Sequence, residues 1–238
     1  LIRINCIGAS TTGNYIRKNE KNYSYPLELE RILKKKYQLN LEVNNFGQGG
    51  YNSADLLIRY ITQGIYTKPD YIIIYHAYND VRSYLSQNFN SDYSHSLKNF
   101  SEVYWKYYLG SKIPNIRLNF LNYLINKYLF PLEERSTILE AIEKTKIDLT
   151  ANYLPGLVTY ERNIQSIIDL SLANNTKVIL CTFCIYLYPE IKDEPLHILY
   201  KNIVDEENKI IKKLALKNNL DFVDSASSIP LDNSNFLD

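Results

Sequence analysis

Residues 71–80 read YIIIYHAYND, a continuously apolar run that passes directly into polar and turn-forming residues. A run this short and this apolar is typical of a β-strand that is covered on both faces, as the strands of parallel sheets are. A second run of the same kind, VILCTF at residues 178–183, lies in the C-terminal half of the chain. Together the two runs predict a parallel β-sheet at the centre of the fold.

Outward from these runs, the same patterns recur along the chain. Short apolar segments that end in polar or turn residues predict strands at residues 2–7, 41–46, 71–75, 177–182 and 220–223. Apolar residues three and four positions apart predict helices at residues 25–37, 53–65, 160–174 and 196–218. This alternation predicts an α/β fold: a three-layer α/β/α sandwich with a five-stranded, flavodoxin-like parallel sheet and with functional groups at the carboxyl ends of its strands.

The alternation is interrupted after the third strand. Residues 81–156 are too many for a simple loop, so we predict a largely helical insertion within a single domain that spans residues 1–238. Placed over the strand ends, it would form a lid or a wall of a substrate site. Its aromatic run YWKYYLG at residues 104–110 either stacks on a sugar or acyl group or, in our preferred interpretation, packs against other residues.

The composition narrows the classes of function. Hydrophobic residues make up 45% of the chain and charged residues 22%, which is the profile of a soluble globular domain. A formal net charge of +1 without a long basic run argues against a nucleic-acid partner. The chain has no stretch of about 18 consecutive apolar residues, so we predict no membrane-spanning segment within it.

Other features leave the cellular context open. The sequence begins inside an apolar run and contains no Met, so we expect a piece of a longer protein, and a signal or anchor upstream would leave the compartment undetermined. The oligomeric state is open as well. Cys181 and Cys184 form a CTFC segment that is either redox-active or, in our preferred interpretation, part of the core at the end of a strand. We predict no metal or organic cofactor.

Three predicted strands end in distinctive loops. The first runs into IGASTTGNY, which places Ser10 at a tight turn between two glycines. The second runs into NNFGQGGYNSADLL, where Gly50 allows a sharp turn that points a main-chain N–H inward. The third runs into HAYND and delivers the carboxamide of Asn79 to the same edge. A hydroxyl that attacks a carbonyl group and two N–H donors that hold the resulting oxyanion are the groups that acyl transfer requires.

These segments resemble the motifs of the SGNH, or GDSL-like, hydrolases in their order and spacing along nearly the whole chain. Residues 8–10 correspond to the nucleophile block, residues 45–50 to the N-x-G-x-x-G block, and residues 77–80 to the GxND block.

The resemblance implies roles for three of these residues. Ser10 would be the nucleophile and would form a serine ester intermediate, and the oxyanion would be held by the N–H groups of Ser10 and Gly50 and by the side chain of Asn79. Ala9 and Ala77 stand where the family usually has Asp and Gly, which affects the expected substrate more than the expected chemistry.

The family's last motif, DxxH, is only partly present. The expected Asp corresponds to Asp238, the final residue given, so we expect the catalytic histidine just beyond it. Without a general base, a serine is a weak nucleophile at neutral pH. Among the histidines present, His76 and His95 are candidate substrate contacts, although a packing or surface role is preferred for each, as it is for His197.

Each group also has a purely structural interpretation. Ser10 can cap the helix that follows it, and Asn79 and Gly50 can be ordinary turn residues. Their joint occurrence at three strand ends favours the functional interpretation, and GASTTG lacks the Lys of a phosphate loop. We therefore predict a serine esterase that acts on acetyl or short-chain acyl esters of a small molecule or a glycan, with a carbohydrate O-acetyltransferase and a non-catalytic carbohydrate-binding module as alternatives.

Overall fold

The computed structural model describes residues 1–13, 16–18, 21–86, 89–94, 147–190 and 192–231. The chain divides into two compact units, one formed by Leu1–Tyr84 together with Asn152–Asp238 and the other by Leu85–Ala151.

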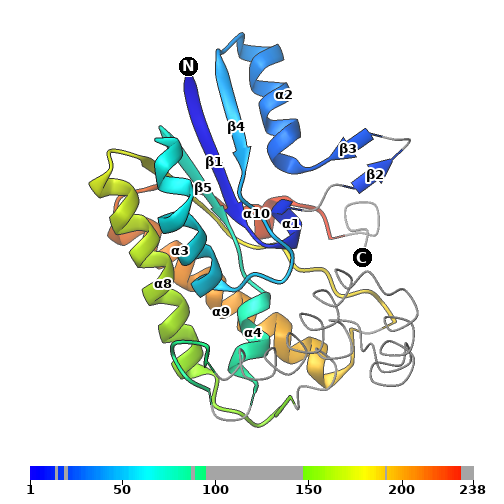
Figure 1. Ribbon diagram of the computed structural model, residues 1–238. Helices are drawn as coiled ribbons and strands as arrows, with labels where there is room; N and C mark the ends of the chain where they lie inside the picture. Colours follow the sequence, from blue (N-terminus) through cyan, green and yellow to red (C-terminus); the bar gives the residue numbers. More distant parts are fainter. Residues whose placement is uncertain (14–15, 19–20, 87–88, 95–146, 191, 232–238) are drawn as a thin grey trace, which may run out of the picture. The chain divides into compact units, whose positions relative to one another are not determined.

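The first unit contains the predicted parallel sheet. Its five strands, in the spatial order β4-β1-β5-β6-β7, are β1 (Ile2–Gly8), β4 (Leu41–Asn45), β5 (Tyr71–Tyr75), β6 (Lys177–Cys181) and β7 (Asp221–Val223). Every neighbouring pair is parallel. The predicted fold class and the five predicted strands are thereby confirmed, and the arrowheads in Figure 1 show that β1, β4 and β5 end at the same edge of the sheet.

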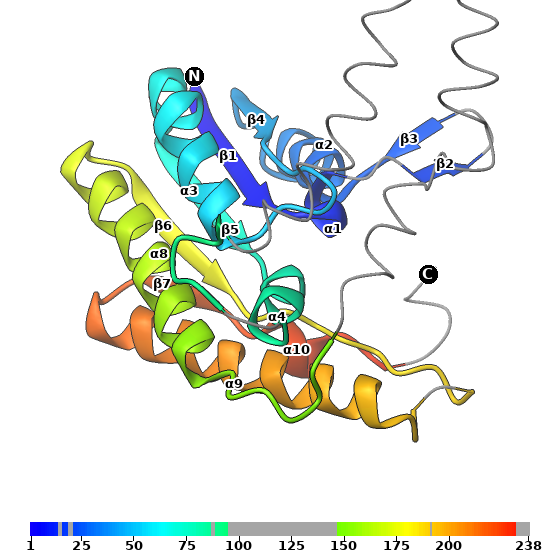
Figure 2. The ribbon, with the colours of Figure 1, turned by 60° about the horizontal axis from the view of Figure 1, so that its bottom comes forward.

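The long helices connect successive strands of this sheet. They are α2 (Tyr25–Tyr37), α3 (Ser53–Thr62), α8 (Leu154–Ala173) and α9 (Pro195–Lys217). Helix α3 packs beside α8, and α8 beside α9, while α2 packs against β4. Figure 2 shows α2 and α3 on opposite sides of β1, as a three-layer sandwich requires.

Short elements complete the first unit. They are the helices α1 (Ser10–Gly13), α4 (Asn79–Tyr84) and α10 (Ser225–Ser228), the 3₁₀ helix η1 (Gly64–Thr67), and the antiparallel pair β2 (Ile16–Lys18) and β3 (Lys21–Tyr23). The β2–β3 pair was not predicted, because strands of three residues are too short to show an apolar alternation.

Two helix boundaries differ from the predicted ones by more than one residue. Helix α3 ends at Thr62, and the chain continues through η1 rather than as one helix to residue 65. Helix α8 begins at Leu154 rather than at residue 160. Pro155 lies in its first turn, where a main-chain N–H would have no partner within the helix, so the missing N–H of proline costs no hydrogen bond. Residues 154–156, which the prediction placed in the insertion, therefore belong to α8 and to the first unit.

The two faces of the sheet are not buried equally along β5, although consecutive residues of β1 from Ile4 to Gly8 are buried on both faces. In β5, Ile72 and Ile74 are fully buried, whereas Tyr71, Ile73 and Tyr75 on the other face are half-buried. The sequence predicted a strand covered on both faces, and in β5 the second face is covered only in part.

The cysteines behave as core residues. Cys6, Cys181 and Cys184 are buried and none forms a disulfide. Burial raises the pKa of Cys6 to about 12 and that of Cys181 to about 11, so these thiols stay protonated and unreactive at neutral pH. The preferred interpretation of the CTFC segment is confirmed.

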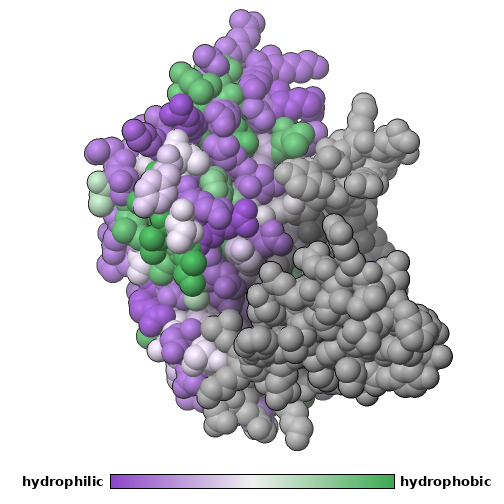
Figure 3. Space-filling model, in the orientation of Figure 1, coloured by the Kyte–Doolittle hydropathy of each residue, from purple (hydrophilic) through white to green (hydrophobic). Residues whose placement is uncertain are grey.

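The described surface is mainly hydrophilic, with separate hydrophobic patches (Figure 3). One patch lies over α3 and α8, where Ile58 and Val158 are 59% and 69% exposed. No helix in the described part of the chain is long and apolar enough to span a bilayer.

The second unit is described only at its two ends. Ser86 and Ile147 form an antiparallel bridge, and the N–H of Asp148 donates to the carbonyl oxygen of Leu85 at 2.8 Å. The predicted aromatic run lies outside the described residues, so the helical lid stays a prediction.

Candidate active site

The turn after β1 holds Ser10 at the first position of α1. The N–H groups of Thr12 and Gly13 donate to the carbonyl oxygen of Ala9 at 3.1 and 2.9 Å, which closes the turn directly after the strand. A side chain at Gly8 would overlap that of Thr12, so the end of the strand requires glycine.

The hydroxyl of Ser10 does not stabilise the fold through a hydrogen bond to any residue in the described part of the chain. The residue is half-buried, and its Oγ makes no hydrogen bond to any residue that the structure describes. The capping interpretation requires this oxygen to accept an N–H from the following helix, and that bond is not formed. Ser10 therefore presents a hydroxyl that no described neighbour engages.

The loop after β4 is fixed against the Ser10 turn. The side-chain amide of Asn45 donates to the carbonyl oxygen of Thr12 at 3.0 Å, and its Oδ1 accepts the N–H of Gly47 at 2.9 Å. The backbones at Gly13 and Gly47 lie so close that a Cβ on either residue would overlap the other. Asn45 and the two glycines thus join the first two predicted motifs into one rigid pair of loops.

The same loop brings Gly49 near Ser10. A Cβ on Gly49 would lie 4.0 Å from the Cβ of Ser10, which is ordinary van der Waals contact. Gly50 has a φ of +80°, in the left-handed region that glycine adopts without strain, and nothing lies within 4 Å of the Cβ position there. Gly50, to which the resemblance assigns an oxyanion donor, thus directly follows Gly49, the position near Ser10.

Asn79 follows β5 through a tight turn centred on Tyr78. The N–H of Asn79 donates to the carbonyl oxygen of Ala77 at 2.8 Å, and Tyr78 has a φ of +72°, the combination found in a strained γ-turn. Such a backbone conformation costs about 1–3 kcal/mol for a residue other than glycine. Surrounding contacts must therefore hold this turn in place.

The Asn79 carboxamide reaches the loop that also touches Ser10. Its Nδ2 donates to the carbonyl oxygen of Tyr51 at 2.8 Å, which uses one of the two N–H donors of the amide. The segments that carry Ser10 and Asn79 therefore both approach residues 49–51: a Cβ on Gly49 would lie within 4.0 Å of the Cβ of Ser10, and Asn79 is bonded to Tyr51.

Asp80 joins the two loops that follow β4 and β5. Its buried carboxylate accepts the N–H of Ser53 at 2.9 and 3.1 Å and the Ser53 hydroxyl at 2.6 Å. The side chain of Asn163, on α8, donates to the same hydroxyl oxygen at 2.9 Å. The start of α3, the start of α4 and the middle of α8 are thereby held by one buried polar network.

His76 belongs to this network. It is 1% exposed, its Nε2 lies 2.6 Å from Oδ2 of Asp80, and its ring stacks on that of Tyr160 with centroids 6.2 Å apart. The hydroxyl of Tyr160 also donates to the His76 carbonyl oxygen at 2.7 Å. The structure gives His76 an interior position, in line with the packing role preferred over substrate contact.

The other predicted site residues divide into two groups. His95 and Asp238 lie outside the described residues, so their roles stay predictions. His197 lies in the first turn of α9, half-exposed, with its Nε2 3.3 Å from Oε2 of Glu194, which fits the surface role predicted for it.

Sequence reasoning missed Glu207. It is fully buried on α9, and its carboxyl oxygens accept the N–H of Tyr78 at 3.2 Å and the hydroxyl of Tyr84 at 2.9 Å. Burial, and secondarily the negative charge of Asp80, raise the pKa of Glu207 well above its ordinary value. The available signal was its position within the buried stripe of the helix, one turn after Ile203 and one turn before Ile211.

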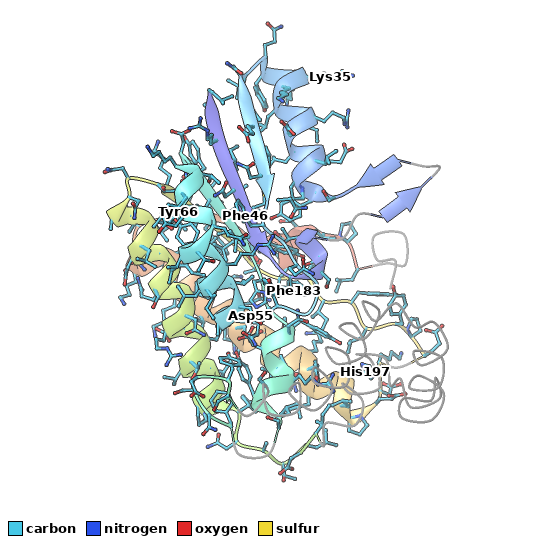
Figure 4. The ribbon with its side chains drawn as sticks, in the orientation of Figure 1. Lys35, Phe46, Asp55, Tyr66, Phe183 and His197 are labelled. Atoms are coloured by element: carbon cyan, nitrogen blue, oxygen red, sulfur yellow. The ribbon has the colours of Figure 1, made fainter. Side chains whose placement is uncertain are left out.

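The neighbouring Asn208 secures a fourth strand end. Its carboxamide accepts the N–H of Phe183 at 2.7 Å and donates to the carbonyl oxygen of the same residue at 2.9 Å. The Phe183 ring stacks on Tyr75 with centroids 5.1 Å apart. Figure 4 shows Phe183 near the carboxyl ends of the strands. Helix α9 therefore braces the site edge through two adjacent polar residues.

The described part of the chain has no cluster of three or more His, Cys, Asp or Glu side chains arranged to hold a metal ion. The chemistry that the described groups offer is that of a hydroxyl and of N–H donors.

Among the comparisons with known proteins, only the one with solved structures found matches, and these share one fold. No protein-family model matches the sequence, and no curated protein matches it. Among solved structures, a protein assigned to the G-D-S-L lipolytic family from Desulfitobacterium hafniense matches with a TM-score of 0.52 at 16% identity, over 99% of this chain and 83% of that one. The lipase/acylhydrolase from Enterococcus faecalis matches with a TM-score of 0.52 at 16% identity, over 96% and 78%.

A catalytic mutant of an acetylxylan esterase from Geobacillus stearothermophilus matches with a TM-score of 0.54 at 18% identity, over 95% of this chain and 77% of that one. The chain therefore has the α/β sandwich fold of the SGNH, or GDSL-type, hydrolases, as the sequence motifs predicted.

Proposed function

We propose that this protein is a serine esterase of the SGNH type, with Ser10 as its nucleophile. The observation that carries the proposal is the approach of two loops to residues 49–51: a Cβ on Gly49 would lie 4.0 Å from the Cβ of Ser10, and Asn79 donates to the carbonyl oxygen of Tyr51. A hydroxyl, a flexible glycine backbone and a carboxamide brought together at the carboxyl edge of a parallel sheet are the groups that acyl transfer needs.

The proposed reaction proceeds in two balanced steps. Oγ of Ser10 attacks the ester carbonyl carbon while its proton passes to a general base, the role that the resemblance gives to the histidine of the DxxH motif. The oxyanion that forms is held by the N–H groups of Ser10 and Gly50 and by Asn79. The ester C–O bond then breaks, and the alcohol leaves with that proton. Water repeats the sequence on the acyl-serine and releases the carboxylic acid.

We further propose acetyl or short-chain acyl esters, on a small molecule or a glycan, as the substrates. The support comes from the acetylxylan esterase and the lipase/acylhydrolase that share the fold. Transfer of the acyl group to a sugar hydroxyl would use the same residues, so the choice between water and sugar as acceptor decides between an esterase and an O-acetyltransferase.

The proposal is tested by labelling the full-length protein with a fluorophosphonate probe and mapping the modified peptide. We expect the label on Ser10, and we expect Ser10→Ala to abolish both labelling and hydrolysis of p-nitrophenyl acetate. Ser166→Ala, which removes a hydroxyl bound only to its own helix, is the matched control and keeps full activity. Unchanged ester hydrolysis by the Ser10→Ala variant would overturn the nucleophile assignment.

A further inference from the structure

Glu207 makes contacts that converge on the segment carrying Asn79. One carboxyl oxygen accepts the N–H of Tyr78, the residue immediately before Asn79, and the other accepts the hydroxyl of Tyr84 at the end of α4. The two bonds hold α4 at both of its ends. Tyr78 and Glu207 are 129 residues apart in the sequence.

The Tyr78 bond acts on a strained backbone. The residue has a φ of +72°, and the Asn79 N–H points back to the Ala77 carbonyl oxygen at 2.8 Å. This turn directs the Tyr78 N–H towards the interior of the sandwich, where Glu207 is the acceptor. Without that acceptor, the part-buried N–H of Tyr78 loses its partner and the turn can relax towards a right-handed conformation, which would displace the Asn79 carboxamide.

The cost of placing a carboxyl group at residue 207 supports a specific role. The buried stripe of α9 is otherwise mostly apolar around it, with Ile203, Val204, Ile211 and Leu214 fully buried or nearly so. A leucine would satisfy the packing of such a stripe without desolvating a carboxyl group. The two hydrogen bonds to the α4 segment are the contacts that a leucine would lose.

We propose that Glu207 is a positioning residue for the reaction: it holds the Tyr78 turn in its left-handed conformation and thereby fixes the Asn79 carboxamide where the oxyanion develops. Glu207 itself does not touch the substrate. The inference rests on the proposed esterase function and adds to it a residue from the opposite end of the sequence.

The first test compares Glu207→Leu with Glu207→Gln in the full-length protein, with p-nitrophenyl acetate as substrate. The leucine variant keeps the packing and removes both acceptors, so kcat should fall by about 10- to 100-fold with little change in KM. The glutamine variant keeps a carbonyl oxygen for the Tyr78 N–H and places its amide group at the Tyr84 hydroxyl, so kcat should stay within about threefold of the wild type.

Tyr60→Phe is the matched control. It removes the buried hydroxyl of Tyr60, on α3, which accepts a hydrogen bond from Ser171, on α8, at 2.9 Å. It should reduce stability without changing kcat. A leucine variant with wild-type kcat, or a glutamine variant as impaired as the leucine variant, would overturn the positioning role.

A double-mutant comparison identifies the route of the effect. Asparagine adopts left-handed backbone conformations more readily than tyrosine, so Tyr78→Asn makes the turn less dependent on Glu207. The loss of kcat caused by Glu207→Leu should therefore be smaller in the Tyr78→Asn background than in the wild type. Equal losses in both backgrounds would show that Glu207 does not act through this turn.

The two proposals fail in different ways. If Ser10→Ala retains esterase activity, the proposed function is wrong whatever the Glu207 variants do. If Ser10→Ala is inactive while Glu207→Leu is folded and fully active, the esterase proposal stands and the positioning role is wrong. Should the leucine variant not fold, the glutamine variant and the Tyr78→Asn comparison made with Glu207→Ala decide the question.

Discussion

The carboxamide of Asn79 donates a 2.8 Å hydrogen bond to the main-chain carbonyl oxygen of Tyr51. This bond fastens the turn after one strand to the loop after another, two positions from Gly49, where a Cβ would lie 4.0 Å from the Cβ of Ser10. Because the amide nitrogen is held in this way, the orientation of its second N–H is also fixed. The preorganisation of an N–H donor before the substrate arrives is what makes such donors effective in acyl transfer.

We predict that Asn79→Ala lowers kcat for p-nitrophenyl acetate hydrolysis by about 10²–10³-fold with little change in stability. The matched control is Asn174→Ala, which also removes a bond from a side-chain amide to a main-chain carbonyl oxygen, but on an exposed helix end. The control should keep wild-type kcat. Equal activity of the two variants would refute the role of Asn79 as an oxyanion donor.

Asp80→Ala should destabilise the protein strongly, by about 3–5 kcal/mol in the free energy of unfolding. The substitution leaves the Ser53 N–H and the His76 ring without their buried acceptor. Asp169→Ala, in which an exposed carboxylate on α8 is lost, should change stability by less than about 0.5 kcal/mol. Urea unfolding followed by circular dichroism measures both, and similar midpoints would contradict the network.

Glu207→Gln should alter how stability depends on pH. The folded pKa of Glu207 is raised above its ordinary value of 4.5, so between these two values the folded state binds a proton that the unfolded state has lost. Stability is therefore fully present below about pH 4.5 and falls as the pH rises towards the folded pKa, by at most about 1.4 kcal/mol per pH unit.

The glutamine variant has no proton to lose and should not show this decline. Its free energy of unfolding, relative to that of the wild type, should increase from pH 5 to pH 8. A difference between the two proteins that stays constant over this range would show that Glu207 is ionised in the folded state.

Gly50→Ala should cost about 1–2 kcal/mol in stability, because the backbone at Gly50 has a φ of +80° and a Cβ strains this conformation even where space is open. Gly49→Ala is the neighbouring comparison. Its backbone is not left-handed and its Cβ would meet Ser10 only at 4.0 Å, so it should destabilise less. Thermal unfolding of both variants measures the difference, and the reverse order of stability would contradict the left-handed turn.

Much of this fold could be predicted because its strands are short, apolar and separated by helical patterns. The run at residues 71–75 was predicted with its observed bounds, and the carboxyl-edge placement of Ser10, Gly50 and Asn79 follows from parallel topology alone. Glycine positions could be assigned to turns because only sharp backbone reversals or close approaches favour them.

The contacts that hold the site together could not be predicted in the same way. Glu207 and Tyr78 are 129 residues apart, and no local pattern indicates that they pair. The left-handed turn at Tyr78 contradicts the intrinsic preference of tyrosine, so tertiary contacts override the local signal there. A polar residue on an otherwise apolar helical stripe is the one trace that such contacts leave in a sequence.

The bridge between Ser86 and Ile147, with the bond from Asp148 to Leu85, has a consequence for how this chain can vary. The chain leaves and returns through two segments that are already paired, like the stem of a hairpin. The number of residues beyond the stem can then grow or shrink without changing the separation of its ends.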